Sequence, residues 1–313
     1  MSLPTDPSTL AGLVVSGDRR ALARALSIVE DRRPGDRELL TLCSGPAPGP
    51  PIVGISGAPG AGKSTLTDRL VAERRRSGAS IAVLAVDPAS PFTGGAILGD
   101  RIRMQEHAGD PGVFIRSASS RGHLGGLTAA AGRMLAVIGA AGFDEVIVET
   151  VGVGQSEVEV VDAADTTVVV LTPGWGDAVQ ANKAGLLEAA DVFVVNKADR
   201  AGADETVRHL HQMLDLGGER RWRPPILSTV ATTGGGIAEL SEAVARHRRY
   251  LADSGEGEER RRLRRRRQVH LALHEALVSR LGGETDTGDG LLGAVERGEI
   301  DPWTAAARLL PGG

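Results

Sequence analysis

The stretch Gly57-Ala-Pro-Gly-Ala-Gly-Lys63-Ser64-Thr65 decides the fold of this 313-residue chain. It follows a β-rich run, PIVGIS at 51–56, and leads into a helical run, STLTDRLVAERRR at 64–76. Glycines let such a loop wrap around a phosphate, toward which main-chain N–H groups and the helix start point. The alternative is a glycine-rich turn that contains a lysine by chance. Such a turn would not be expected to lie between a strand and a helix, as this stretch does. The predicted phosphate-binding residues are Gly57, Ala58, Pro59, Gly60, Ala61, Gly62, Lys63, Ser64 and Thr65.

Short β-rich runs alternate with helical stretches through the middle of the chain. Such alternation predicts an α/β fold, a doubly wound and mostly parallel sheet with crossover helices. We expect an N-terminal helical extension at 1–48, a phosphate-loop domain at 49–254 and a C-terminal helical arm at 255–313. The predicted strands are PIVGIS (51–56), SIAVLAV (80–86), GVFIRS (112–117), DEVIVET (144–150), DTTVVVLT (165–172), DVFVVN (191–196) and PPILST (224–229).

Composition excludes several classes of protein. The single cysteine, Cys43, forms no disulfide within the chain, and the polar start MSLPTDPSTL lacks a signal-peptide pattern, so we expect a cytoplasmic location. No apolar stretch approaches the roughly 20 residues that span a bilayer. The net charge of −4 gives no general attraction to nucleic acid or membrane. The arginine run 260–267 leaves a nucleic-acid surface open, but Glu256, Glu258 and Glu259 precede it at helical spacing and favour a charged helix face.

Lysine is rare in this chain, and its positions are informative. Only three of the 36 basic residues are lysine: Lys63, Lys183 and Lys197. A bias toward arginine should leave lysine where a compact ammonium on a flexible stem is needed. All three lysines are therefore candidates for a functional role, and Lys63 is expected to span the β- and γ-phosphates.

Carboxylates stand at the ends of two predicted strands. Asp87 closes SIAVLAVD and Glu149 closes DEVIVE, each after a run of buried aliphatic residues. Parallel strands bring their carboxyl ends to one edge of the sheet, beside the phosphate loop, where Mg²⁺ held by the Ser64 hydroxyl needs oxygen ligands. Asp87 precedes a proline, so capping or a turn is its alternative role.

The segment after Glu149, Thr-Val-Gly152-Val-Gly154-Gln155, has the pattern of a switch that senses a γ-phosphate. A glycine N–H would meet that phosphate while neighbouring groups position the attacking water. Gln155 and Asp100 are candidates here, with solvated loop positions as the alternative. The predicted catalytic residues are Lys63, Glu149, Gly152, Gln155 and Lys183.

A base-selecting element closes the strand DVFVVN, in Asn196-Lys197-Ala-Asp199. The Asp199 carboxylate can accept from both N1–H and the 2-amino group of guanine, whereas adenine has no such donor pair. Adenine would leave a buried acceptor unpaired, which is costly. The Lys197 stem can lie against the base, and Asn196 can bond the base and neighbouring loops. A further loop after PPILST, with Ser228, Val230 and Ala231, could bring the Ala231 N–H to the guanine carbonyl.

These motifs, in this order, resemble the methylmalonyl-CoA mutase-associated GTPases, the MeaB/ArgK-like group. Only the first and last are general GTPase motifs, so the resemblance does not depend on the phosphate loop alone. The matching segments are GAPGAGKST (57–65), VLAVDPASPFTGGAILGDRIRM (83–104), RSASSRGHLGGL (116–127), ETVGVGQSE (149–157), TPGWGDAVQANKAGLLEAAD (172–191) and VVNKAD (194–199).

The resemblance implies a GTP hydrolase that uses Mg²⁺, with Ser64, Asp87, Asp100 and Glu149 serving the metal site. It implies a mobile loop from Asp177 to Lys183, which would give Lys183 its role. It also implies a homodimer formed partly by the C-terminal arm, and a partner, adenosylcobalamin-dependent methylmalonyl-CoA mutase, whose cofactor loading and protection the GTPase controls.

Other functions in the same branch of GTPases remain as alternatives. A metallochaperone would need a cluster of cysteine or histidine, whereas the seven histidines are dispersed and Cys43 is alone. A signal-recognition GTPase would need a methionine-rich module, and the chain has four dispersed methionines. A small-molecule or protein kinase shares the phosphate loop but has no use for guanine selection. A regulator of another client protein also stays open.

Overall fold

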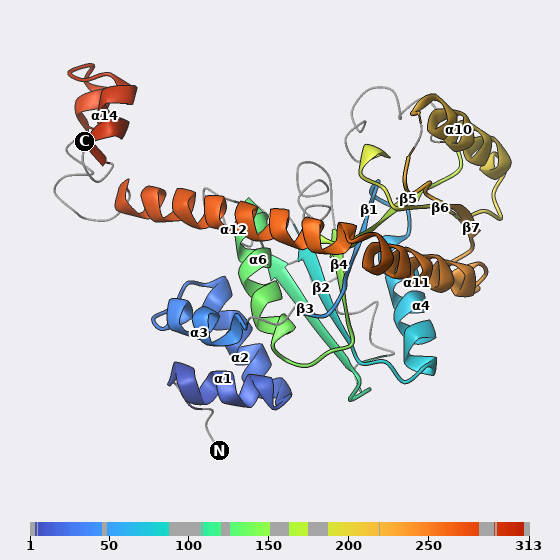
Figure 1. The fold of residues 1–313 in the computed structure, drawn as a ribbon, viewed down its shortest axis with the longest axis horizontal. Coiled ribbons are helices and arrows are strands. Elements are labelled where there is room, and N and C mark those ends of the chain that lie inside the picture. Colours follow the sequence, from blue (N-terminus) through green and yellow to red (C-terminus); the bar gives the residue numbers. More distant parts are fainter. Residues whose placement is uncertain are drawn as a thin grey trace.

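The computed structural model describes residues 4, 6–45, 49–87, 107, 109–119, 126–150, 163–174, 187–218, 220–281, 291 and 293–309. Within them, all seven predicted β-rich runs form strands of one parallel sheet, in the order β3-β2-β4-β1-β5-β6-β7 (Figure 1). The strands are β1 Ile52–Gly57, β2 Ile81–Asp87, β3 Val113–Ser119, β4 Glu145–Thr150, β5 Thr166–Leu171, β6 Val192–Asn196 and β7 Ile226–Thr229.

Helices cover both faces of the sheet, so the predicted doubly wound architecture is confirmed. On one face, α4 (Lys63–Arg76) and α11 (Ile237–Ser254) pack on alternate strand residues such as Ile55 and Val83. On the other face, α6 (Gly126–Gly139) packs on Leu84, and α10 (Ala203–Leu216) lies against β6 and β7. Strand side chains alternate between the faces, so aliphatic runs buried on both sides are what such a sheet requires.

The N-terminal segment forms three helices, α1 (Pro7–Val15), α2 (Arg19–Glu30) and α3 (Asp36–Cys43). They share a hydrophobic core with α6 and with β2 and β4. Cys43 is 5% exposed in that core, and burial raises the pKa of its thiol. This segment is therefore built onto one face of the sheet, as Figure 1 shows.

The C-terminal segment begins with the 26-residue helix α12 (Glu256–Leu281), which runs from the end of α11 across α6, and α14 (Pro302–Leu309) lies beyond its far end (Figure 1). Glu275 of α12 bonds to Arg133 of α6, at 2.7 Å, and to Arg32. Arg262 pairs with Glu259 at 2.7 Å along the same helix, as the charged-face interpretation expects. None of the helices in the described part of the chain has the length and apolar character to cross a bilayer.

Candidate nucleotide-binding site

The phosphate loop connects β1 to α4 at the carboxyl edge of the sheet. Gly57 has a φ of 141°, and a Cβ there would collide with the main-chain oxygen of Val170 in β5. Gly62, with a φ of 89°, is the N-cap of α4, and a Cβ would collide with the Asn196 side chain. Both positions therefore require glycine, because L side chains rarely adopt a positive φ and no space is left for one.

Lys63 lies inside the loop that it is predicted to serve. Its side chain is buried at 6% exposure, and its ammonium group donates to the main-chain oxygens of Gly57, at 2.7 Å, and Ala58, at 3.1 Å. An ammonium held by carbonyl oxygens at the mouth of a phosphate loop can exchange them for phosphate oxygens, because both are acceptors. The geometry therefore agrees with the phosphate role predicted for Lys63.

Ser64 and Glu149 meet beneath the loop. Glu149 is the next-to-last residue of the buried strand β4, where it pairs in register with Ile55 of β1 and Ala85 of β2. The Ser64 hydroxyl donates a 2.5 Å hydrogen bond to Oε1 of Glu149, and both residues are buried, at 7% and 1% exposure. A hydroxyl beside a buried carboxylate is a pair of hard oxygen donors, which suits Mg²⁺. Two of the four predicted metal-binding residues are thus brought together.

Asp87 is the third predicted metal-binding residue that the structure describes. The main chain of Asp87 closes β2 opposite Ser119, at the same edge of the sheet as Glu149. Asp100, Gly152, Gln155 and Lys183 lie outside the described residues, so their predicted roles stay predictions. Groups of three or more His, Cys, Asp or Glu side chains suited to a metal ion do not occur among the described residues.

The Asn196 side chain, at the end of β6, hydrogen-bonds to two loops. Its amide donates from Nδ2 to the main-chain oxygen of Ala61, at 2.8 Å, and Oδ1 accepts from the Thr229 hydroxyl and the Ala231 N–H, both at 3.1 Å. Asn196 is 2% exposed. The side chain predicted to contact the base therefore also holds the phosphate loop and the loop after β7, and the Ala231 N–H predicted to meet guanine bonds Asn196.

Lys197 and Asp199 complete the base-selecting element. Lys197 has an uncommon positive φ of 60°, and its Nζ donates to the main-chain oxygen of Gly60 at 2.6 Å. Its aliphatic stem thereby spans from the end of β6 to the phosphate loop. Asp199 follows in an exposed turn, where its carboxylate is accessible to a ligand. Ser228 is also exposed, while Val230 is half-buried and its N–H bonds Gly235.

Thr229 is a site residue that the sequence analysis did not select. It is 1% exposed and donates to Asn196 at the end of β7. The signal for it is weak, because a threonine at a strand end has many structural roles. Its position next to Ser228, within the predicted loop, is the clue that could have identified it.

Comparison with known proteins agrees with this site. The family described as Methylmalonyl Co-A mutase-associated GTPase MeaB matches residues 22–286. A protein of Pyrococcus horikoshii is 47% identical over 298 residues, which cover 94% of each chain. A Caenorhabditis elegans protein named methylmalonic aciduria type A homolog, mitochondrial, is 36% identical over 273 residues, 79% of this chain and 67% of its own.

A solved structure titled LAO/AO transport system kinase superposes with a TM-score of 0.71 at 28% identity and covers 98% of both chains. The phosphate loop, all seven strands of the sheet and the base-selecting element lie within residues 22–286, the part of the chain that the family matches. The chain belongs to the methylmalonyl Co-A mutase-associated GTPase (MeaB) family and is a GTP-hydrolysing enzyme.

Proposed function

We propose that this GTPase depends on Mg²⁺ and acts in the cytoplasm as a chaperone of adenosylcobalamin-dependent methylmalonyl-CoA mutase, controlling the loading and protection of that enzyme's cofactor. The observation that carries the proposal is the family match over residues 22–286, since the family is described by its association with the mutase. The name of the C. elegans relative, which refers to methylmalonic aciduria, supports the same partner.

The described residues support a mechanism based on positioning and charge. Bound Mg²⁺ would neutralise charge on the β- and γ-phosphates, with Ser64 and Glu149 as the described residues suited to hold it. Lys63 would leave the carbonyl oxygens of Gly57 and Ala58 to contact those phosphates. Water would attack in line. We propose that intrinsic turnover is slow and that the mutase raises it, with Gly152, Gln155 and Lys183 in the loops that respond.

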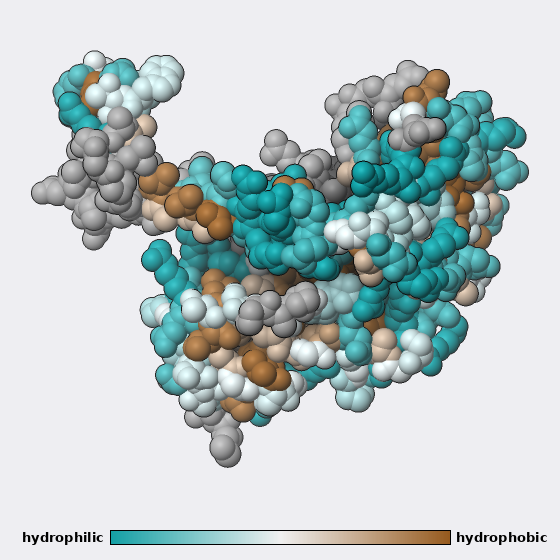
Figure 2. Space-filling model, viewed as in Figure 1, coloured by the Kyte–Doolittle hydropathy of each residue, from teal (hydrophilic) through white to brown (hydrophobic). Residues whose placement is uncertain are grey.

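We also propose that the protein is a homodimer and that the arm 255–313 contributes to the interface. Val269, Leu273 and Leu277 follow one another at intervals of four along α12 and are 58%, 58% and 37% exposed. Trp303 of α14 is 81% exposed. Figure 2 shows hydrophobic side chains gathered toward the far end of α12. Burying such a stripe against a second copy would remove apolar surface from water.

The domain division at 1–48, 49–254 and 255–313 is part of the same proposal. The GTPase domain would carry the nucleotide site, and the arm would carry the interface. The N-terminal helices would move with the GTPase domain, because they share a core with its sheet.

The decisive experiment measures phosphate release from GTP by the purified protein, with and without methylmalonyl-CoA mutase, in Mg²⁺ and in EDTA. We expect GTP hydrolysis that requires Mg²⁺ and rises several-fold with the mutase. The Lys63→Ala variant should hydrolyse GTP neither with nor without the mutase. This result would exclude a contaminating GTPase as the source of the activity. A rate of GTP hydrolysis that the mutase does not change would overturn the proposed partner but would leave the assignment as a GTPase intact.

ATP serves as the second substrate in the same assay. The solved structure named as a transport-system kinase makes this control necessary. Equal use of ATP, with phosphate transferred to a protein or small molecule, would favour the kinase alternative over the chaperone function.

A further inference from the structure

A cavity of about 700 Å³ lies between α12, α6 and the end of α3, at the edge of the sheet where β1 begins. Ile52, the first residue of β1, and Leu135 of α6 form part of its wall. The nucleotide site lies at the opposite edge, where β1 ends in the phosphate loop. The cavity is therefore separate from the GTP-binding residues, and its volume falls within the range of about 300–1,000 Å³ that is usual for small-molecule sites.

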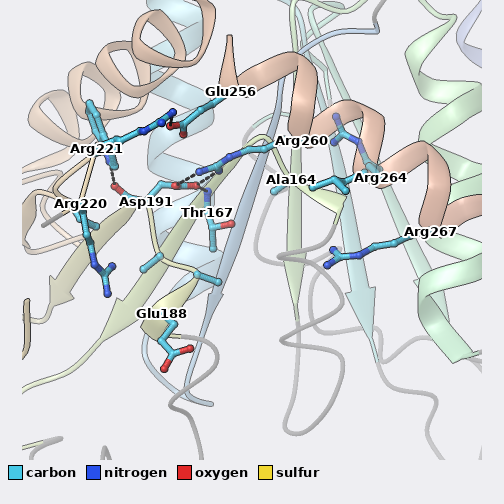
Figure 3. Close-up of a pocket in the computed structure, with 15 residues that line it drawn as sticks. Ala164, Thr167, Glu188, Asp191, Arg220, Arg221, Glu256, Arg260, Arg264 and Arg267 are labelled. Carbon is cyan, nitrogen blue, oxygen red and sulfur yellow. Dashed lines mark hydrogen bonds and ion pairs between the residues drawn. The ribbon is translucent and has the colours of Figure 1, made fainter. Parts of the chain in front are cut away.

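Ion pairs hold α12 in place on both sides of this cavity. Near the start of the helix, Arg260 donates to both carboxylate oxygens of Asp191, at 2.8 and 2.9 Å (Figure 3). Further along, Glu275 accepts two hydrogen bonds from Arg133 of α6, at 2.7 and 2.8 Å. The α12 residues that line the cavity fall between these anchors, within 261–271. A helix held at both ends is kept from settling onto α6, so the space beneath it is preformed.

Much of the cavity wall is apolar, and part of that apolar surface is exposed. Val15 of α1 and Leu42 of α3 line the cavity and are 60% and 45% exposed. Exposed aliphatic side chains that gather at one cavity differ from the single ones scattered over any protein surface. A ligand with an apolar body would cover them and remove their surface from water.

Four arginines of α12 also line the cavity, and two of them are occupied. Arg264 donates to Asp165 at 2.6 Å, so that these two charges balance. Arg267 already has an interaction of its own. Neither of these arginines is needed for a ligand.

The other two arginines share one carboxylate. Glu258 accepts from Nε of Arg261 at 3.2 Å and, through its other oxygen, from Arg265 at 2.7 Å. These three residues carry an excess of one positive charge, which suits a monoanion. Arg261 has the longer bond to Glu258 and the less exposed side chain, 33% against 59% for Arg265. An ion pair at such a surface contributes little to stability, so Arg261 can turn its guanidinium to a ligand at little cost.

We propose that this cavity binds a linear aliphatic carboxylate, a fatty acid, with its chain along α6 and its carboxylate at Arg261. The chain would lie against the apolar wall, and two parallel N–H groups of the guanidinium would hold the carboxylate. Because α12 belongs to the C-terminal arm and α3 to the N-terminal helices, the ligand would contact both segments. The proposal does not depend on the identity of the GTPase's partner.

Decanoate is the probe, and 1-decanol is an uncharged molecule of the same chain length. Each is titrated by calorimetry into protein saturated with GDP and Mg²⁺. We expect decanoate to bind saturably and about five-fold more tightly than 1-decanol, as one partly exposed ion pair allows. Cys43, the single cysteine of the chain, lines the cavity and is 5% exposed, so it reports the place of binding. Bound decanoate should slow alkylation of Cys43 by N-ethylmaleimide.

Arg261→Gln tests the anionic end. We expect the variant to bind decanoate about five-fold more weakly than the wild type and to bind 1-decanol equally well. Arg262→Gln is the matched control, because Arg262 is the next residue of the helix, pairs with Glu259 at the same spacing of three and does not line the cavity.

Gly132→Leu tests the place of the chain. Gly132 of α6 lines the cavity, and a Cβ there would meet only the Gln268 side chain, at 3.8 Å, which is an ordinary contact. Leucine also favours a helix more than glycine does. We expect the variant to keep the unfolding midpoint of the wild type or to raise it, and to lose saturable decanoate binding. Gly12→Leu makes the same change on α1, where a Cβ meets nothing within 4 Å, and should bind decanoate normally.

Four results would each overturn the proposal. They are no saturable binding of decanoate, equal affinities for decanoate and 1-decanol, unchanged alkylation of Cys43 in the complex, and decanoate binding that both Arg261→Gln and Gly132→Leu retain. GTP hydrolysis by these variants should match that of the wild type, because neither residue lies at the nucleotide site. Failure of this inference is therefore distinct from failure of the GTPase proposal.

Discussion

The side-chain amide of Asn196 donates a 2.8 Å hydrogen bond to the main-chain oxygen of Ala61, inside the phosphate loop. The two residues are 135 positions apart in sequence, and the bond joins the base-selecting strand end to the phosphate site. Because Oδ1 of the same amide holds the loop after β7, the base and phosphate parts of the site are positioned by one buried side chain.

Asn196→Ala should weaken binding of every nucleotide. It removes hydrogen bonds to three buried or partly buried partners, and leaving such groups unsatisfied costs about 1–3 kcal/mol each before relaxation and water entry. We expect the free energy of unfolding to fall by about 2–3 kcal/mol and the affinities for GTP and xanthosine triphosphate to fall together. Chemical denaturation and nucleotide titration measure these effects. Loss of GTP affinity alone would show that Asn196 acts only on the base.

Asp199→Asn should change base preference without loosening the site. Asp199 is exposed and stands outside the Asn196 network, so its replacement leaves the phosphate loop intact. The amide oxygen and amino group of asparagine complement xanthine, which has a carbonyl where guanine has an amino group. We expect the ratio of kcat/KM for xanthosine triphosphate to that for GTP to rise by at least 100-fold. Retained selectivity for GTP would remove Asp199 from base recognition.

Ser64→Ala should raise the Mg²⁺ concentration needed for hydrolysis. The substitution removes the hydroxyl that donates to Glu149 at 2.5 Å. The proposed metal site then keeps the buried carboxylate but has one oxygen ligand fewer for Mg²⁺. We expect kcat to fall by about 10²–10³, the loss seen when one group that stabilises transition-state charge is deleted. Ser77→Ala is the matched control, because that serine only caps the end of the same helix. An unchanged Mg²⁺ dependence would exclude Ser64 as a ligand.

The sheet and the phosphate loop could be predicted from sequence because their signals are local. Aliphatic runs such as those of β1 and β6 are buried on both faces, and the glycines of the loop occupy positions where φ is positive. The meeting of Ser64 with Glu149 was also within reach, since parallel strands place their carboxyl ends at one edge.

The contacts of the arginine run could not be predicted in the same way. The glutamates that precede the run at helical spacing predict local pairs, and Arg262 forms one of them with Glu259. Arg260 and Arg264 instead reach Asp191 and Asp165, which are 69 and 99 positions away in sequence. No local pattern specifies partners at that distance. The sequence gives two indications of these ion pairs. The two arginines are four positions apart, which puts them on one helix face, and an aspartate directly precedes each of two strands.

Leu273→Glu should dissociate the proposed dimer. Leu273 is 58% exposed in the middle of the apolar stripe on α12, and a buried charge without a partner is costly at an interface. We expect sedimentation to give the mass of a 32.5 kDa monomer for the variant and about twice that mass for the wild type. Leu216→Glu is the control, because Leu216 is 89% exposed on α10, away from the arm. Equal masses for wild type and Leu273→Glu would exclude this stripe as the interface.

His247 should make folding sensitive to acid. The imidazole is completely buried, with Nδ1 2.9 Å from the Thr166 hydroxyl and Nε2 3.3 Å from Asp191. Burial lowers the pKa of His247 below its ordinary 6.5, and attraction to Asp191 only partly opposes this. The unfolded chain therefore takes up a proton that the folded chain resists, so the stability contributed by His247 is complete above pH 6.5 and is lost as pH falls below it.

Denaturant unfolding at several pH values between 7.5 and 5 tests this sign. His247→Gln should flatten the decline in the free energy of unfolding by up to about 1.4 kcal/mol per pH unit, the limit for one proton. His211→Gln, at an exposed position on α10, should leave the slope unchanged. If the His247 variant keeps the wild-type slope, the imidazole takes up its proton equally in both states, and Asp191 then stabilises the charged ring as much as burial opposes it.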